Sequence, residues 1–172
     1  MPGKVIGEKL NYGYAGTPSR MPDCIIVPYK FDIAHPGKKI NFGEPVAFDA
    51  TNGGVRPLTS TDTATAVIGF AVRRISQPKS DDANGWYYAP GEVVDVLVRG
   101  SMSVKLVDTE SLAARGQVYV TNGKYASRAA GGIMAKNDST NGDTLAVPGA
   151  IFSHGQVDGD NVTEITLTQR IV

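Results

Sequence analysis

Few side chains in this sequence have the chemistry for catalysis. The chain has two histidines, His35 and His154, and one cysteine, Cys24. A histidine can act as a general base, but His35 precedes the turn Pro36-Gly37, His154 precedes Gly155, and neither lies in a nucleophile or metal motif. We therefore predict no catalytic residue and expect the protein not to be an enzyme.

The acidic segment Asp158-Gly159-Asp160-Asn161, followed by Glu164, has part of the composition of a calcium-binding loop. A full loop needs ligands at alternate positions, a Gly at the sixth position and a Glu at the twelfth, and this segment lacks them. A turn between two strands explains the same residues through local hydrogen bonds. Phosphate-binding glycine motifs are also missing from the sequence. We predict no metal site and no cofactor.

Three consecutive aromatic residues, Trp86, Tyr87 and Tyr88, follow the turn residues Asn84-Gly85. Such rings can anchor a protein interface, stack on a sugar, or cover the protein's own core at the start of a strand. The sequence leaves these three interpretations open, and all three residues are candidate interface residues.

Charge and hydropathy narrow the choice of partners. The 17 Lys and Arg residues equal the 17 Asp and Glu residues in number and are scattered, so the chain lacks the basic surface that binds a phosphate backbone. No apolar run reaches the roughly 18 residues of a membrane span, and the N-terminus has no apolar signal-peptide stretch. The single cysteine cannot pair within the chain. We expect synthesis in a reducing cytoplasm and neither a nucleic-acid nor a membrane partner.

Residues 1–24 are predicted to form an extended N-terminal arm, and residues 25–172 a β domain. Prolines recur in the arm and discourage regular strand pairing. The arm also carries residue types that are enriched at protein interfaces. The candidate contact residues in the arm are Tyr12, Tyr14, Arg20 and Met21. The alternative is that the arm packs over its own domain.

The elements that must position these residues have the two-residue period of β-strands. The clearest is 92–107, where apolar side chains occupy most even positions and polar ones most odd positions, with Gly100 at the middle suggesting a bend. Small residues between Val67 and Ile75 predict close packing by a neighbouring backbone. Further strands are predicted at 25–27, 42–48 and 162–172.

Turn signals separate these strands. A short helix is predicted over 108–116, a hairpin at Asn122-Gly123 with strands at 118–120 and 124–126, and a loop over 127–144. Strands spaced by about ten residues with turns between them are typical of an all-β sandwich or barrel. We predict that class, with at most one or two short helical turns.

A succession of sequence blocks resembles the structural cement proteins of tailed bacteriophages. None of the blocks is a chemical signature, and the resemblance rests on their order over most of the chain. The blocks are Tyr14-Ala15-Gly16-Thr17-Pro18-Ser19-Arg20, Ile25-Ile26, Phe42-Gly43-Glu44-Pro45-Val46, Ile68-Gly69-Phe70-Ala71-Val72-Arg73, residues 88–101, Gly116-Gln117-Val118-Tyr119-Val120 and Val147-Pro148-Gly149-Ala150-Ile151-Phe152.

This resemblance implies a β-barrel or jelly-roll-like domain on the outside of a phage capsid, with no catalytic centre. The implied partners are the major capsid protein, whose adjacent subunits the protein bridges, and further copies of the chain as a dimer or trimer on a capsid symmetry axis. The implied location is the exterior of the virion. The alternative is a carbohydrate-binding β module on a virion or cell surface, with Trp86, Tyr87 and Tyr88 as its platform.

Overall fold

The computed structural model describes residues 11–34, 37–74, 79–81, 85–124, 128–138 and 142–169. Within this part the chain is all-β, as predicted, and the one helical element is a 3-10 turn, η1. The elements are β1 (Pro18–Lys30), β2 (Ile40–Asn41), β3 (Pro45–Asp49), β4 (Gly54–Pro57), η1 (Ala64–Ala66), β5 (Val67–Ala71), β6 (Lys79–Asp81), β7 (Gly85–Tyr88), β8 (Val93–Asp108), β9 (Gln117–Thr121), β10 (Ile133–Met134), β11 (Thr144–Phe152) and β12 (Val162–Leu167).

The strands form a nine-stranded sheet and a small three-stranded sheet. The large sheet runs in the order β10-β9-β11-β12-β8-β5-β3-β4, and β1 pairs with β8 outside this path. It closes into a barrel because β10, next to β9, also pairs with β8 in parallel. The small sheet has the order β2-β7-β6 and carries Trp86.

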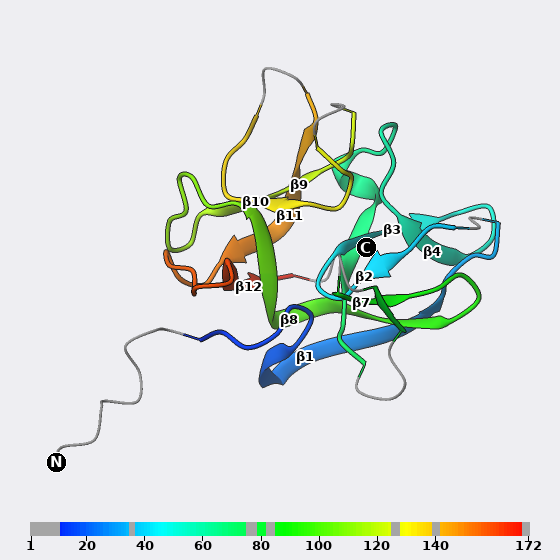
Figure 1. The fold of residues 1–172 in the computed structure, drawn as a ribbon, viewed down its shortest axis with the longest axis horizontal. Helices are drawn as coiled ribbons and strands as arrows, with labels where there is room; N and C mark the ends of the chain where they lie inside the picture. Colours follow the sequence, from blue (N-terminus) through cyan, green and yellow to red (C-terminus); the bar gives the residue numbers. More distant parts are fainter. Residues whose placement is uncertain are drawn as a thin grey trace, which may run out of the picture.

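The long strand β8 joins the two halves of the molecule. β8 pairs with β5 before its midpoint and with β12 from Gly100 to Lys105, and it pairs with β1 on both sides of Gly100. Figure 1 shows β8 (green) bending as it passes from the region of β1 and β7 to that of β9 to β12. Gly100 lies at the change of partner with a φ of +114°, so the glycine predicted to allow a bend has a backbone conformation that other residues rarely adopt.

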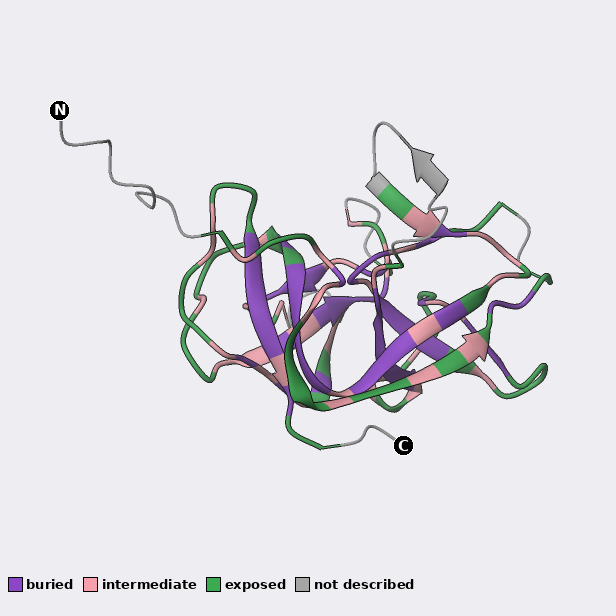
Figure 2. Cartoon of the chain, turned by 90° about the horizontal axis from the view of Figure 1, so that it is seen from below, coloured by how far each residue is buried: buried purple, intermediate pink, exposed green. Residues whose placement is uncertain are grey.

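The apolar side chains of β8 divide between two cores. The first core contains Leu97 and the even-numbered residues after the bend, which are Met102, Val104 and Leu106. The second core contains the even-numbered residues before the bend, which are Val94, Val96 and Val98. The single inward-facing series expected from the sequence therefore serves two separate interiors. Figure 2 shows buried residues (purple) along the long strands.

Strand β5 lies between these two cores and is buried on both faces. Val67 and Phe70 pack in the first core, whereas Ile68 and Ala71 pack in the second. At Gly69 the backbone of β8 comes so close that an added Cβ would collide with the carbonyl oxygen of Leu97. The close approach predicted from the small residues of this strand is confirmed.

The helix predicted over 108–116 is wrong. The segment instead forms two turns, with Ser111 and Arg115 in the left-handed region at φ 63° and 62°, which a right-handed helix does not contain. The Asp108 carboxylate accepts a hydrogen bond from the N–H of Glu110 at 2.9 Å. This two-residue Asx turn takes the place of the helix cap that the same Asp was expected to provide.

The region after β9 differs in part from its prediction. The turn at Asn122-Gly123 is present, with a φ of +74° at Gly123. The strands that pair with β9 are β10 and β11, and most of the expected return strand 124–126 falls outside the described residues. The segment 127–144, expected to be a loop, contains the short strand β10.

The boundary predicted at residue 24 falls inside β1, which begins at Pro18. Residues 1–10 lie outside the described part of the chain. The final predicted strand corresponds to β12, and residues 170–172 are also outside the described part.

Candidate interaction surface

Residues 11–17, here called the strap, lie against the β body. The N–H of Gly16 donates to the carbonyl of Ser103 in β8 at 2.7 Å, and the N–H of Ser103 donates to Thr17 at 2.9 Å. The N–H of Arg73 donates to Gly16 at 2.7 Å. An added Cβ at Gly16 would lie 2.9 Å from the backbone nitrogens of Arg73 and Gly43, so only glycine fits here. The described part of the predicted arm therefore packs on its own domain.

Tyr12 and Arg20 are held by acidic groups of the body. The N–H of Tyr12 donates to Asp158 Oδ2 at 3.1 Å, and its ring stacks on His154 with the ring centroids 6.0 Å apart. Arg20 Nη2 lies 3.0 Å from Oε1 of the buried Glu164. These contacts fix the two ends of the segment 12–20 to the loop before β12 and to β12 itself.

The pKa of Glu164 reflects this environment. Burial alone would raise it, but hydrogen bonds from Ser153 and Ser19 and the charge of Arg20 outweigh burial and lower the pKa below its ordinary value. Glu164 is therefore held in its charged form. His154 Nε2 lies 3.9 Å from the same carboxylate.

Asp158 acts as the organising residue of a turn. Its Oδ1 accepts hydrogen bonds from the N–H groups of Asp160 and Val162, each at 2.9 Å. Burial would raise the pKa of Asp158, but its backbone hydrogen bonds outweigh that effect and lower the pKa. Within the described residues, no group of three His, Cys, Asp or Glu side chains could hold a metal ion. His35 lies outside these residues.

The three aromatic residues 86–88 occupy three different environments. Tyr88 is 2% exposed and its hydroxyl donates to the carbonyl of Val72 at 2.7 Å, so it is a core residue. The ring of Tyr87 lies 4.7 Å from Lys39 Nζ. Trp86 is 42% exposed and lines a cavity. Because Tyr88 is buried, the three rings do not form the continuous platform that a sugar-binding site would need.

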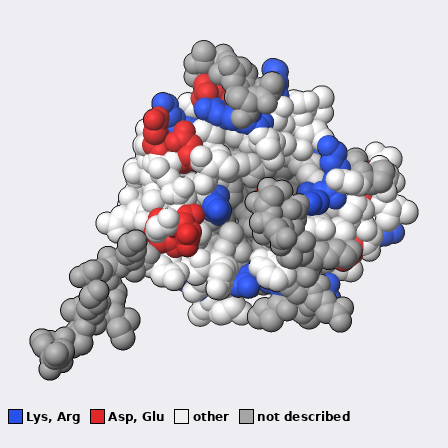
Figure 3. Space-filling view, in the orientation of Figure 1, with Lys and Arg blue, Asp and Glu red and all other residues white. Residues whose placement is uncertain are grey.

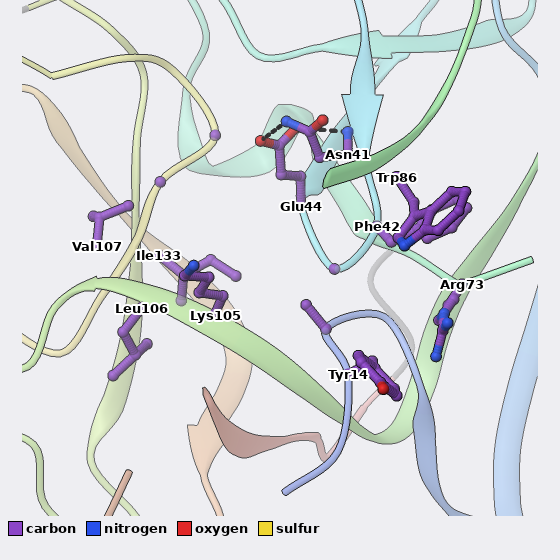
Figure 4. Close-up of a pocket in the computed structure, with 14 residues that line it drawn as sticks. Tyr14, Asn41, Phe42, Glu44, Arg73, Trp86, Lys105, Leu106, Val107 and Ile133 are labelled. Carbon is purple, nitrogen blue, oxygen red and sulfur yellow. Dashed lines mark hydrogen bonds between the residues drawn. The ribbon is translucent and has the colours of Figure 1, made fainter. Parts of the chain in front are cut away.

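A cavity of about 470 Å³ joins Trp86 to the strap. Tyr14, which is 68% exposed, forms one side, and the guanidinium carbon of Arg73 lies 4.2 Å from the centroid of its ring. Figure 4 shows Tyr14, Arg73 and Trp86 on one side of the cavity and Lys105, Val107 and Ile133 across from them. The other lining residues are Ala15, Asn41, Phe42, Gly43, Glu44, Leu106, Gly131 and Gly132.

A second cavity of about 380 Å³ adjoins the first, and the two share Glu44, Val107 and Gly132 as lining residues. The two adjoining cavities are together called the trench. Its walls come from the strap, the β2–β3 turn, β7, β8 and the segment before β10. Because these segments are far apart in sequence, the trench exists only in the folded chain.

A second group of exposed apolar side chains, Met21, Ile25 and Ile26, lies along β1 and is here called the β1 patch. Met21 is 68% exposed, and its neighbours Ile25 and Ile26 are also exposed. This strand pairs with β8 on either side of Gly100, with irregular register between Arg20 and Ile26. The patch and the trench thus lie along different stretches of β8.

Comparison with known proteins gives these surfaces a context. The family described as "Structural cement protein (E217 gp24/Pam3 gp6)" matches residues 2–168. The chain belongs to this family. A solved structure named "The capsid of Myoviridae Phage XM1" resembles this cement-family fold with a TM-score of 0.69 and 19% identity, covering 96% of each chain. The search of curated proteins found no match.

The sequence pointed to some residues of the trench and missed others. Tyr14 and Trp86 were predicted contact residues, and the fold brings them to one cavity. Val107 was missed, although it is an apolar residue at an odd position of β8, where the neighbouring odd residues are polar. The adjacent pair Ile25-Ile26 carried a similar signal, because two consecutive strand residues point to opposite faces.

Among the described residues, no helix has the length and apolar character to cross a membrane.

Proposed function

We propose that this chain binds the outer surface of a phage head, bridges adjacent subunits of the major capsid protein and stabilises the shell, without catalysing a reaction. Membership of the structural cement family over residues 2–168 is the observation that carries the proposal. The similarity to a solved structure named for a phage capsid supports it. The proposal includes no nucleic-acid or membrane partner and places the protein on the virion exterior after synthesis in the host cytoplasm.

A bridging protein needs a rigid body with more than one contact surface. The two cores make the body rigid, and the trench and the β1 patch give it two exposed apolar areas. Each contact alone can be weak, because linking two contacts through one body makes the second one intramolecular and raises the overall avidity. Self-association as a dimer or trimer would multiply these contacts further and match a symmetry axis of the capsid.

The direct test adds purified protein to heads of the parent phage that were assembled without it. Co-sedimentation measures binding, calorimetry measures the melting temperature of the shell, and a cryo-microscopy map locates the added density. We expect saturable binding to the exterior and a higher melting temperature. Absence of binding, or density only inside the head, would refute the proposal.

The contribution of the N-terminal arm is tested by truncation. Deleting residues 1–24 would remove the strap and part of β1, so the informative variant removes residues 1–10 alone and keeps the contacts of Tyr12 and Gly16. We expect this variant to fold normally and to bind heads more weakly. Undiminished binding would show that these ten residues do not belong to the proposed interface. Separately, sedimentation equilibrium of the purified protein distinguishes a dimer from a trimer.

A further inference from the structure

The trench concentrates exposed apolar side chains. Three of the nine large apolar side chains that are exposed among the described residues line it: Tyr14, Trp86 and Val107. Exposed aromatic rings gathered around a concave surface are typical of interface anchors, whereas isolated exposed apolar residues need no explanation. This clustering indicates that the trench is covered by a partner when the protein functions.

The charges in the first cavity are unbalanced. Arg73 and Lys105 are cations, and neither forms an ion pair among the described residues. The one acid, Glu44, accepts hydrogen bonds from the backbone N–H and the side-chain amide of Asn41 at 2.9 Å and 2.6 Å. Burial raises the pKa of Glu44, which disfavours its negative charge. The cavity therefore suits an anionic group.

Charge on the second cavity is already balanced. Arg128 lies there with Asp108, and its guanidinium forms an ion pair with Asp138 at 2.7 Å and lies 3.5 Å from Asp143. The positive charge available to a partner thus comes from Arg73 and Lys105, which line the first cavity.

The shape of the trench fits a chain better than a small ring. Its two cavities share one wall, and Gly43, Gly131 and Gly132 line it with backbone alone, which lets another backbone approach closely. Few neutral polar side chains face it, and the amide of Asn41 is already bonded to Glu44. A sugar site needs several such groups to recognise hydroxyls, so a sugar is a poor fit.

We propose that the trench binds an extended segment of a partner protein in which a carboxylate stands beside an apolar or aromatic side chain. The carboxylate binds in the first cavity, where Arg73 and Lys105 supply positive charge from opposite sides, and the apolar side chain packs among Tyr14, Trp86 and Val107. This inference rests on the proposed function, because it takes the major capsid protein as the source of the segment.

Trp86 gives a direct readout, because it is the only tryptophan in the chain. The probe is a set of overlapping peptides that cover the major capsid protein of the parent phage, with any Trp replaced by Phe. Binding in the trench changes the emission of Trp86, and the titration gives the dissociation constant. We expect the peptides that bind to contain Asp or Glu next to an apolar residue.

Substitutions at Val107 separate charge from size. This residue is 63% exposed, so the fold tolerates replacement. We expect V107E to weaken peptide and head binding about tenfold, because it removes an apolar contact and places a like charge near the incoming carboxylate. V107K removes the same contact but adds a favourable charge, so we expect it to weaken binding less than V107E does. The matched control is V93E, since Val93 is an exposed valine on the same strand outside the trench.

The possible results separate this inference from the proposed function. If the protein binds heads but no peptide alters Trp86 emission, or if V107E and V107K weaken binding equally, the trench inference fails and the function stands. If the protein does not bind heads, the proposed function fails, while the peptide titration still decides whether the trench takes an acidic segment. Binding of a glycan probe in place of any peptide would also overturn the inference.

Discussion

Replacing Gly100 with alanine tests how the two cores are joined. Gly100 has a φ of +114° at the point where β8 changes partners. A Cβ added there would lie 2.8 Å from both Cα and Sγ of Cys24 and 3.0 Å from the carbonyl oxygen of Asp23. These are atoms of β1, and two of them belong to its backbone, so the new methyl group can be accommodated only if β1 moves away from β8.

The expected cost has two parts. Holding a residue other than glycine at this φ costs about 1–3 kcal/mol, and forcing a methyl group into a filled space costs about 1–3 kcal/mol more. The sum is about 4 kcal/mol, a large part of the 5–15 kcal/mol that stabilises a typical domain. Two other glycines distinguish the cost of backbone strain from the cost of crowding. Gly53 has a φ of +67° with no atom within 4 Å of an added Cβ, so it tests strain alone, and Gly159 has neither a positive φ nor a neighbour within 4 Å, so it is the control.

Urea unfolding followed by circular dichroism measures the free energy of unfolding for the three Gly-to-Ala variants. We expect Gly159→Ala to be neutral or stabilised by about 0.5 kcal/mol, Gly53→Ala to lose about 1–2 kcal/mol, and Gly100→Ala to lose about 4 kcal/mol as the sum of strain and crowding. If Gly100→Ala loses no more than Gly53→Ala, the contact between β1 and the bend of β8 does not constrain the fold as argued here.

Three further predictions concern buried polar groups. Tyr88→Phe leaves the Val72 carbonyl without its donor and should cost about 1–2 kcal/mol at pH 7 in urea unfolding. Burial, aided by the charge of Asp95, raises the pKa of Tyr88 to about 12, so the protein loses stability as the pH rises from 10 to 12. Tyr88→Phe should not show this loss, and the same loss in Tyr88→Phe would mean that another group titrates. Burial alone would raise the pKa of Asp62, but the hydrogen bonds from Arg56, at 2.7 Å to each carboxylate oxygen, lower it. Asp62→Asn should therefore be less stable at pH 7 by about 2 kcal/mol, a difference that begins to shrink below about pH 4 and is lost as the pH falls through the lowered pKa of Asp62. A gap of the same size at pH 7 and at pH 2 would argue against the ion pair. Glu164→Gln should melt at a lower temperature than the original protein at pH 7, and at nearly the same temperature in acid, where Glu164 is protonated. Equal melting temperatures at pH 7 would mean that the lowered pKa of Glu164 does not contribute to stability.

Alternation along the sequence was enough to predict β5, β8 and β12 but not how the faces of the strands are used. The period of two identified β8 and its glycine, because side-chain direction along a strand depends only on position parity. Parity could not show that Val98 and Met102 face different cores, since both are even-numbered apolar residues. The change of core depends on which strands pair with β8 on each side of Gly100, and those strands come from distant parts of the chain.

The helix predicted over 108–116 shows a different limit. Asp108 was a good cap and Ala113-Ala114 are helix formers, so local preferences favoured a helix. The N–H of Arg115 instead donates to Phe152 in β11 at 2.8 Å, a contact that no local pattern contains. Pairing with a distant strand therefore decided the conformation of this segment.

For the candidate site, residue type was informative and location was not. Tyr14 and Trp86 were predicted because Tyr and Trp are enriched at protein interfaces and among their anchor residues. Arg73 and Lys105 could not be assigned to the same surface, because β5 and β8 approach the strap only after folding. Tyr88 has the same side chain as its neighbour Tyr87, and only the fold shows that it is a core residue.

Because β8 contributes to two cores, one core can be completed before the other while the chain is being synthesised. All buried residues of the second core lie between Phe31 and Val98, whereas the first core also needs Ile165 and Leu167 of β12. At 5–20 residues per second, the roughly 70 residues between these two groups take roughly 4 to 14 seconds to make. During that interval Phe70 and Leu97, which belong to the first core, have no β12 to cover them. The nascent chain is therefore most prone to aggregate when its N-terminal half has already folded.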